Sequence, residues 1–151
     1  MPSPTVSSVR EHLPGCWDCT HWEFRDDATG ATSLVWNGRV KGRFVFDKEG
    51  RVSLHMMRTD RPGARPSAGP NWAGDMTRDE MLALLDGYLA YWGTYEVDEA
   101  KSLITIHIEG SLRPGWIGVD QYRPCEVAPN GDIILIYNVP GGVHRLTWRK
   151  Q

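Results

Sequence analysis

The chain has 151 residues, of which 40% are hydrophobic and 24% are charged, and its formal net charge at pH 7 is −2. This length and composition are typical of one globular domain that buries a core without disulfides or metals. Because nucleic-acid-binding domains usually carry a basic excess, the charge argues against a nucleic-acid partner.

The first residues are rich in Pro and Ser, and residues 1–12 are predicted to form a flexible N-terminal arm before a single domain over 13–151. They lack the basic and apolar segments of a signal peptide, and no apolar run is long enough to span a bilayer. An odd count of three cysteines fits a reducing compartment. We therefore expect a cytoplasmic protein with no membrane segment.

Most of the chain alternates apolar and polar residues over short runs, which is typical of β-strands. Turn signals separate the runs, among them Asn37-Gly38, Asn130-Gly131 and residues 47–50. A short apolar run lies within 31–39, and the other predicted strands span 16–25, 43–47, 51–58, 90–98, 102–109, 116–127, 132–138 and 143–150.

One segment interrupts this pattern between the predicted strands. Residues 59–76 contain three prolines and three glycines, so we expect a long loop that acts as a lid or binding loop. Thr77 and Glu80 have the spacing of a capping box, and apolar residues follow at helical spacing. The sequence therefore predicts a single helix over 78–88.

Eight or nine short strands with one helix predict an all-β fold. Closure of the sheet removes its exposed edges, so we expect a closed antiparallel β-barrel of about 8–10 strands with one short helix. A barrel of about eight strands has room for one small ligand.

Several stretches of this sequence resemble the small bacterial and fungal lipocalin-like domain proteins over roughly residues 13–150. Gly15-Cys16-Trp17 is similar to the Gly-x-Trp that opens a lipocalin barrel; the other similar blocks span 42–62, 87–97, 105–123 and 146–148. The resemblance implies a cup-shaped barrel for a small apolar or amphipathic molecule. Barrels of this kind occur both as carriers and as cyclases or isomerases in natural-product pathways.

Two positions depart from the pattern of this family. Ile106 stands where relatives often carry a second His, so a two-histidine site is not expected. Pro124 directly after Arg123 predicts a break or bulge in that strand, because Pro cannot donate to a β-ladder.

Arg123 and Gln121 are the first candidates for a ligand site, since they share a strand face with Ile117, Val119 and Val127. A guanidinium is a fixed and always charged donor. We predict that both side chains polarise a carbonyl, enolate or carboxylate oxygen of the ligand. The alternative is a structural Arg that closes one end of the barrel against backbone carbonyls or Trp17.

His107 and Tyr95 are the candidates for moving a proton. Alternation along 102–109 points the three isoleucines inward and leaves His107 in solvent, whereas the family resemblance favours His107 in the site. The Tyr95 hydroxyl either faces the cavity or bonds to a neighbouring strand. Further ligand-binding candidates, with core or solvent-facing positions as their alternatives, are Trp22, His55, Met57, Tyr91 and Trp148.

A metal site is an alternative for the N-terminal region, because the spacing of four residues resembles that of metal ligands: His12, Cys16, Cys19 and His21. The two cysteines would point to opposite faces of a strand, and there is no second Cys-x-x-Cys pair, so we predict no metal. No phosphate loop, dinucleotide fingerprint, nucleophile elbow or His-Glu-x-x-His motif occurs, so no cofactor is predicted.

These observations together predict a protein that binds a small, largely apolar metabolite in a barrel cavity. We expect it to promote cyclisation or isomerisation of that metabolite, including by a pericyclic step, in a biosynthetic pathway and without a cofactor. The alternative is a non-catalytic carrier or sequestering protein, and an interaction module is a third option. A homodimer is compatible with the sequence.

Overall fold

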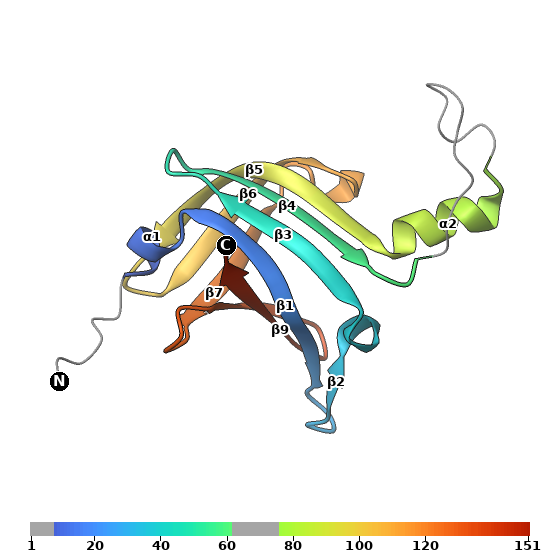
Figure 1. The fold of residues 1–151 in the computed structure, drawn as a ribbon, viewed down its shortest axis with the longest axis horizontal. Coiled ribbons are helices and arrows are strands. Elements are labelled where there is room, and N and C mark those ends of the chain that lie inside the picture. The colour runs from blue at the N-terminus through green and yellow to red at the C-terminus, as the bar shows by residue number, and fades with distance from the viewer. Residues whose placement is uncertain (1–7, 62–75) are drawn as a thin grey trace.

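The computed structural model describes residues 8–61 and 76–151, and it confirms the predicted closed antiparallel barrel (Figure 1). Strands pair in chain order from β3 to β9, and β1 pairs with both β3 and β9, which closes eight strands; β2 adds to the end of β1. The strands are β1 (Gly15–Asp26), β2 (Thr32–Leu34), β3 (Val40–Phe46), β4 (Arg51–Arg58), β5 (Tyr88–Asp98), β6 (Leu103–Ser111), β7 (Asp120–Val127), β8 (Ile133–Val139) and β9 (Gly142–Lys150).

The apolar residues of each strand alternate toward the barrel interior, because successive side chains of a strand point to opposite faces. In β6, Ile104, Ile106 and Ile108 are buried while His107 between them lies outside. The backbone of Gly93 in β5 lies so close to β6 that a Cβ atom at this position would clash with the His107 carbonyl oxygen. The β5–β6 register shifts at this point, where only glycine fits.

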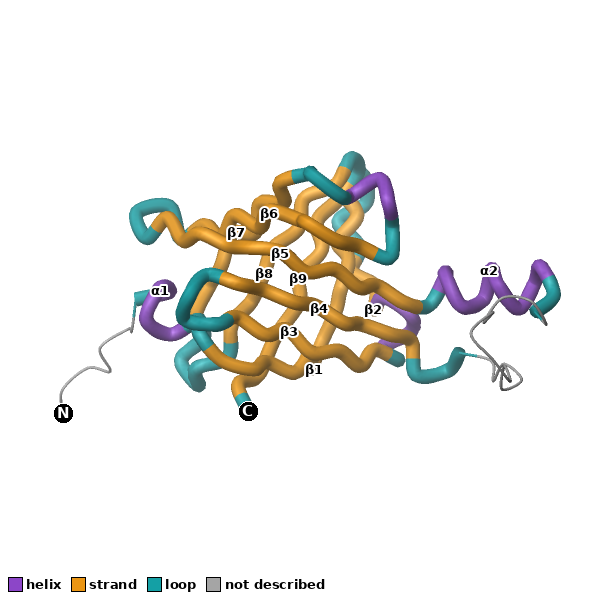
Figure 2. The backbone as a smooth tube through the Cα atoms, turned by 90° about the horizontal axis from the view of Figure 1, so that it is seen from above, coloured by secondary structure: helices purple, strands orange, loops and turns teal. Residues whose placement is uncertain are grey.

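The helices lie at the ends of the barrel, and α2 (Arg78–Asp86) extends away from it (Figures 1 and 2). Thr77 and Glu80 form the predicted capping box. The helix ends before the predicted residue 88 because Tyr88 already belongs to β5. Two 3-10 turns, over Val35–Gly38 and Pro114–Trp116, were not predicted. No helix in the described part of the chain is long and apolar enough to cross a membrane.

A second short helix, α1 (Val9–His12), lies within the predicted N-terminal arm. Val9 and Leu13 are buried in the core, and the Leu13 carbonyl accepts a hydrogen bond of 2.8 Å from Trp17 Nε1. The prediction of a flexible arm is therefore wrong for residues 9–12, which cover one end of the barrel. Residues 1–7 of that arm lie outside the described residues.

The barrel wall is split between β7 and β8. These strands pair only from Cys125 to Val127, whereas the preceding part of β7 pairs with β6 alone. The split begins at Pro124, which has no N–H to donate, so the predicted break is seen on the β8 side of the strand. β7 also begins at Asp120 and not at residue 116, since the 3-10 turn occupies the start of the predicted strand.

Candidate functional site

The barrel encloses a cavity of about 60 Å³ that has an almost entirely apolar and aromatic wall. Seven of the strands contribute to this wall because their inward-facing residues converge on it. The lining side chains, which include no Asp or Glu, are Trp22, Phe44, Leu54, Met56, Leu89, Tyr91, Trp116, Gln121, Arg123, Leu135, Tyr137, Leu146 and Trp148.

Arg123 is the charged group in this wall, and its described partners are all neutral. Its Nη1 donates to the Tyr122 carbonyl at 3.0 Å, and its Nη2 donates to Gln121 Oε1. The guanidinium carbon lies 4.3 Å from the centroid of the Tyr137 ring, a cation–π contact. Burial lowers the pKa of Arg123, but guanidinium groups stay protonated in proteins. The cavity wall therefore holds a positive charge without a carboxylate partner.

The other polar groups of the cavity are mainly donors. Trp148 Nε1 is buried and has no hydrogen-bond partner among the described residues. Burial raises the pKa of Tyr91 to about 12, so its hydroxyl keeps its proton at neutral pH. Because Gln121 presents its oxygen to Arg123, its amide nitrogen remains available as a further donor.

His144 lies beside the cavity on β9. Its Nδ1 is 3.1 Å from Trp22 Nε1, which can only donate, so Nδ1 is the acceptor in this pair. Burial lowers the pKa of His144, and the Arg123 charge lowers it further, so the ring is neutral at pH 7. A neutral ring with Nδ1 unprotonated carries its proton on Nε2. His144 thus holds the Trp22 ring and has no free basic nitrogen.

A cleft of about 430 Å³ lies outside the split between β7 and β8. Trp116, Gln121, Arg123 and Tyr137 line both this cleft and the cavity. Arg123 therefore stands at the boundary between the barrel interior and the surface. Other residues of the cleft include Val119, Asp120 and Asn138.

The structure brings together five of the predicted site residues. Trp22, Tyr91, Gln121, Arg123 and Trp148 all line the cavity. Of the structural alternative for Arg123, a hydrogen bond to a backbone carbonyl is seen, that of Tyr122, whereas the aromatic ring beneath the guanidinium is that of Tyr137 and not Trp17. The predicted lid over 59–76 cannot be placed against this cavity, because residues 62–75 lie outside the described part.

The structure does not bring the two predicted proton-transfer residues to the cavity. His107 points outward, where Nδ1 lies 2.6 Å from Asp120 Oδ1 and Nε2 lies 3.4 Å from Glu96 Oε2. The alternation along β6 correctly predicted that His107 faces outward. The family resemblance favoured His107 in the ligand site, and that placement is wrong. Tyr95 points inward, but its hydroxyl donates to the Asp47 carbonyl at 2.6 Å and does not line the cavity.

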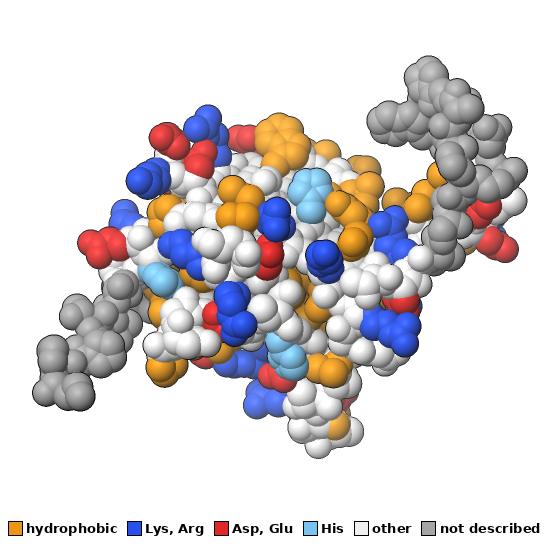
Figure 3. Space-filling model, viewed as in Figure 1, with side chains coloured by type: hydrophobic (Ala, Val, Ile, Leu, Met, Phe, Trp, Pro, Cys, Tyr) orange, Lys and Arg blue, Asp and Glu red, His pale blue; other side chains and the backbone are white. Residues whose placement is uncertain are grey.

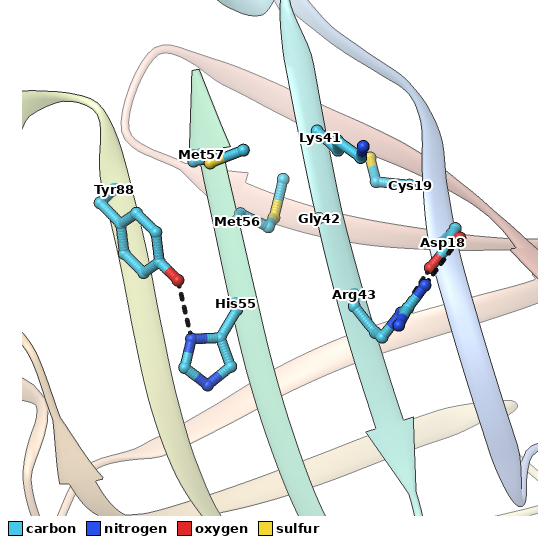
Figure 4. A pocket seen from close by; sticks show the side chains of 9 residues that line it. All are labelled: Asp18, Cys19, Lys41, Gly42, Arg43, His55, Met56, Met57 and Tyr88. Carbon is cyan, nitrogen blue, oxygen red and sulfur yellow. Dashed lines mark hydrogen bonds and ion pairs between the residues drawn. The ribbon is translucent and has the colours of Figure 1, made fainter. Parts of the chain in front are cut away.

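His55 and Met57 lie on the outer face of β4, so of the two positions left open for this face the outward one is observed, and neither residue lines the cavity. They line an outer groove of about 500 Å³ that crosses β1, β3, β4 and β5 (Figure 4). The His55 Nδ1 lies 2.9 Å from the Tyr88 hydroxyl. On the other side of the groove, Arg43 donates to both oxygens of Asp18, at 2.9 and 3.3 Å.

The Cys/His constellation near the N-terminus is dispersed. His12 lies 2.7 Å from the Gly131 carbonyl oxygen, Cys19 donates to the His21 carbonyl, and His21 pairs with Glu23. Within residues 8–61 and 76–151, no three His, Cys, Asp or Glu side chains form a group that could hold a metal. The surface seen in Figure 3 intersperses acidic and basic side chains.

Sequence reasoning missed three aromatic residues of the site, Phe44, Tyr137 and Trp116. Tyr137 shares a face with Ile133 and Leu135 on β8, and this alternation could have placed it in the cavity. Trp116 reaches the cavity from a 3-10 turn, for which no periodic signal exists.

The comparison with known proteins agrees with this geometry. No curated protein matches the chain. The family model described as a lipocalin-like domain matches residues 14–150, which include every strand of the barrel and every residue of the cavity. The chain therefore belongs to the lipocalin-like domain family, and its barrel is consistent with the binding of a small molecule.

Proposed function

We propose that this protein binds one small amphipathic metabolite, with the apolar part of the ligand inside the barrel. The observation that carries this proposal is the Arg123 guanidinium, which faces an apolar cavity and has no carboxylate partner among the described residues. Removing a charge from water is costly unless a partner compensates for the loss. An oxygen of a bound ligand would supply that partner.

The size of the cavity limits how the ligand is held. Typical small-molecule pockets measure about 300–1,000 Å³, so a space of about 60 Å³ holds only a small apolar group. A larger metabolite must extend past Arg123 into the adjacent cleft, or the aromatic side chains around the cavity must move. Either arrangement keeps the apolar part of the ligand against the Trp, Phe and Leu side chains of the wall.

A second candidate function is cofactor-independent cyclisation or isomerisation of the bound metabolite. The donors of Arg123, Trp148 and Tyr91 would stabilise negative charge that develops on an enolate-like oxygen in a site of low polarity. Because His107 and Tyr95 lie elsewhere, the described wall offers no evident general base. The chemistry would then depend on orienting an already reactive substrate, as in a pericyclic step.

Ligand binding is tested with the neutral fluorescent probe N-phenyl-1-naphthylamine. We expect saturable binding of one probe per chain, with emission sensitised by the cavity tryptophans. Leu89→Trp fills the cavity and should weaken binding at least tenfold, whereas Val45→Trp on the exposed outer face of β3 should not. Equal probe affinity in both variants and the unmodified protein would contradict binding in the cavity.

Catalysis is tested with polyene or polyketide precursors that cyclise spontaneously to several products. An enzyme of the proposed kind changes the ratio or the rate of formation of these products, and Leu89→Trp removes this change. A carrier binds the precursor and leaves the product ratio as it is in buffer.

A further inference from the structure

We propose that the ligand is an amphipathic monoanion whose carboxylate lies in the split between β7 and β8, against Arg123, while its apolar part enters the barrel cavity, whose aromatic side chains move to admit more than a small group. This inference rests on the proposed function and specifies the class of ligand. Three features of the structure support it: the split in the wall, the donors that border it, and the charges around the cleft.

The split lets the ligand carboxylate reach Arg123 while the carboxylate stays partly exposed to solvent. β7 and β8 stop pairing at Cys125 and Leu135, so nothing in their ladder closes the wall beside Arg123. Arg123 and Gln121 line both the interior cavity and the outer cleft. A molecule that crosses the wall here has one end in an apolar space and the other end at the surface. That geometry matches an amphipathic ligand.

Among the described residues that line the cleft beside the split, Arg123 is the one cation, and its guanidinium can only donate hydrogen bonds. Arg123 bonds to two neutral oxygens and has further N–H groups in its planar fork, which suits the two oxygens of a carboxylate. Trp148 lines the cavity and not the cleft, and its buried N–H has no partner among residues 8–61 and 76–151. An uncharged hydrocarbon would give neither Trp148 nor the remaining N–H groups of Arg123 an acceptor.

The charges near the cleft favour a monoanion over a phosphate. Asp120 lines the same cleft as Arg123 and keeps its own partner, His107, at 2.6 Å. A doubly charged group would meet this carboxylate as well as the guanidinium. A single carboxylate on the Arg123 side balances the one positive charge of the wall and leaves the Asp120 pair intact.

The experiment compares octanoate with 1-octanol, which have the same chain length and differ in charge. Each displaces N-phenyl-1-naphthylamine from the full chain. We expect octanoate to bind about 10- to 150-fold more tightly than octanol, the ratio typical of a charge-assisted hydrogen bond. Arg123→Met should remove this preference and leave octanol affinity within about threefold. Arg43→Met, an outer arginine that faces neither cavity nor cleft, is the matched control and should keep the preference.

The outcomes separate this inference from the proposed function. Equal affinity for octanoate and octanol in the unmodified protein, or a preference that survives Arg123→Met, overturns the inference while cavity binding stands. Failure of octanoate, octanol and the neutral probe to bind overturns both. Should Arg123→Met not fold, Arg123→Gln keeps a polar side chain without the charge, and a preference that persists in that variant also overturns the inference.

Discussion

The inner cavity and the outer groove lie on opposite faces of the same barrel, and their polar groups are used differently. In the outer groove, Arg43 is paired with Asp18 and His55 with Tyr88 (Figure 4). In the cavity, Arg123 has only neutral partners, and Trp148 Nε1 has none among the described residues. The groove is the larger space, yet the cavity is the better ligand site, because among the described residues the Trp148 N–H has no acceptor and the Arg123 charge has no carboxylate.

The same contrast holds for arginines elsewhere on the outside of the barrel. Six of them pair with carboxylates at the surface: Arg39, Arg43, Arg51, Arg58, Arg145 and Arg149. Such exposed pairs contribute little to stability, but in each of them a carboxylate offsets the charge of the guanidinium. Arg123 differs from these six because it faces the cavity and has only neutral partners among the described residues, which calls for a functional explanation.

The largest difference between the two faces should appear in stability, at neighbouring residues of β6. Ile106 is fully buried, so Ile106→Ala should lower the free energy of unfolding by about 2–5 kcal/mol through lost contacts and a residual cavity. His107→Ala on the outer face should cost less than about 1 kcal/mol, since its ion pairs are exposed to solvent. Urea denaturation at pH 7.5 measures both. Similar costs for the two variants would show that the faces are wrongly assigned.

A smaller effect separates an outer arginine from the inner one. Arg149 is bonded through Nε and Nη2 to Asp132, whose side chain is buried. Arg149→Met leaves this carboxylate with fewer partners and should lower the melting temperature by a few degrees at neutral pH. Arg123→Met leaves no carboxylate without a partner and removes a charge that is partly shielded from water, so its melting temperature should stay the same or rise. Thermal unfolding followed by circular dichroism compares the two variants. A larger loss for Arg123→Met would make Arg123 structural.

The sequence predicted the strands well because each long strand of this barrel has one apolar face, which points to the interior. Alternation along β6 alone placed the isoleucines inside and His107 outside, as observed. The family resemblance pointed to the wrong face for His107, because similarity at a position does not specify the local register. Arg123 and Gln121 were found as polar residues on a strand face that was predicted to be apolar; Val127 of that face lies in β7, whereas Ile117 and Val119 lie before the strand and are exposed. That signal depends only on the period of a strand.

The rest of the site depends on contacts between segments that are distant in the sequence. The split beside Arg123 lies where the ladder between β7 and β8 ends, at Cys125 and Leu135. The contact of Arg123 with the Tyr137 ring joins residues of two strands. Neither could be predicted without the relative positions of β7 and β8, whereas Pro124 marked the place where pairing fails.

The smallest expected effect is a pH dependence of the outer face. The hydrogen bond to Asp120, aided by Glu96, raises the pKa of His107 above its ordinary value of 6.5. The protonated ring is thus favoured in the folded state, so this stabilisation is fully present below pH 6.5 and is lost as pH rises through the higher, folded-state pKa. His107→Gln should therefore be less stable than the unmodified protein at pH 6, and the difference should shrink by pH 9.

Urea midpoints measured from pH 5.5 to pH 9 test this dependence, and the difference should stay below about 1 kcal/mol because the pair is exposed. A difference that grows with pH would contradict the assigned hydrogen bond.

Octanoate affinity connects the outer face to the inner one. Asp120 borders the cleft, and in His107→Gln its negative charge no longer has the imidazole as a partner. Repulsion between this charge and the carboxylate should make octanoate bind slightly less well, while octanol binding is unchanged. Equal small losses for both probes would instead indicate a change in the shape of the cleft.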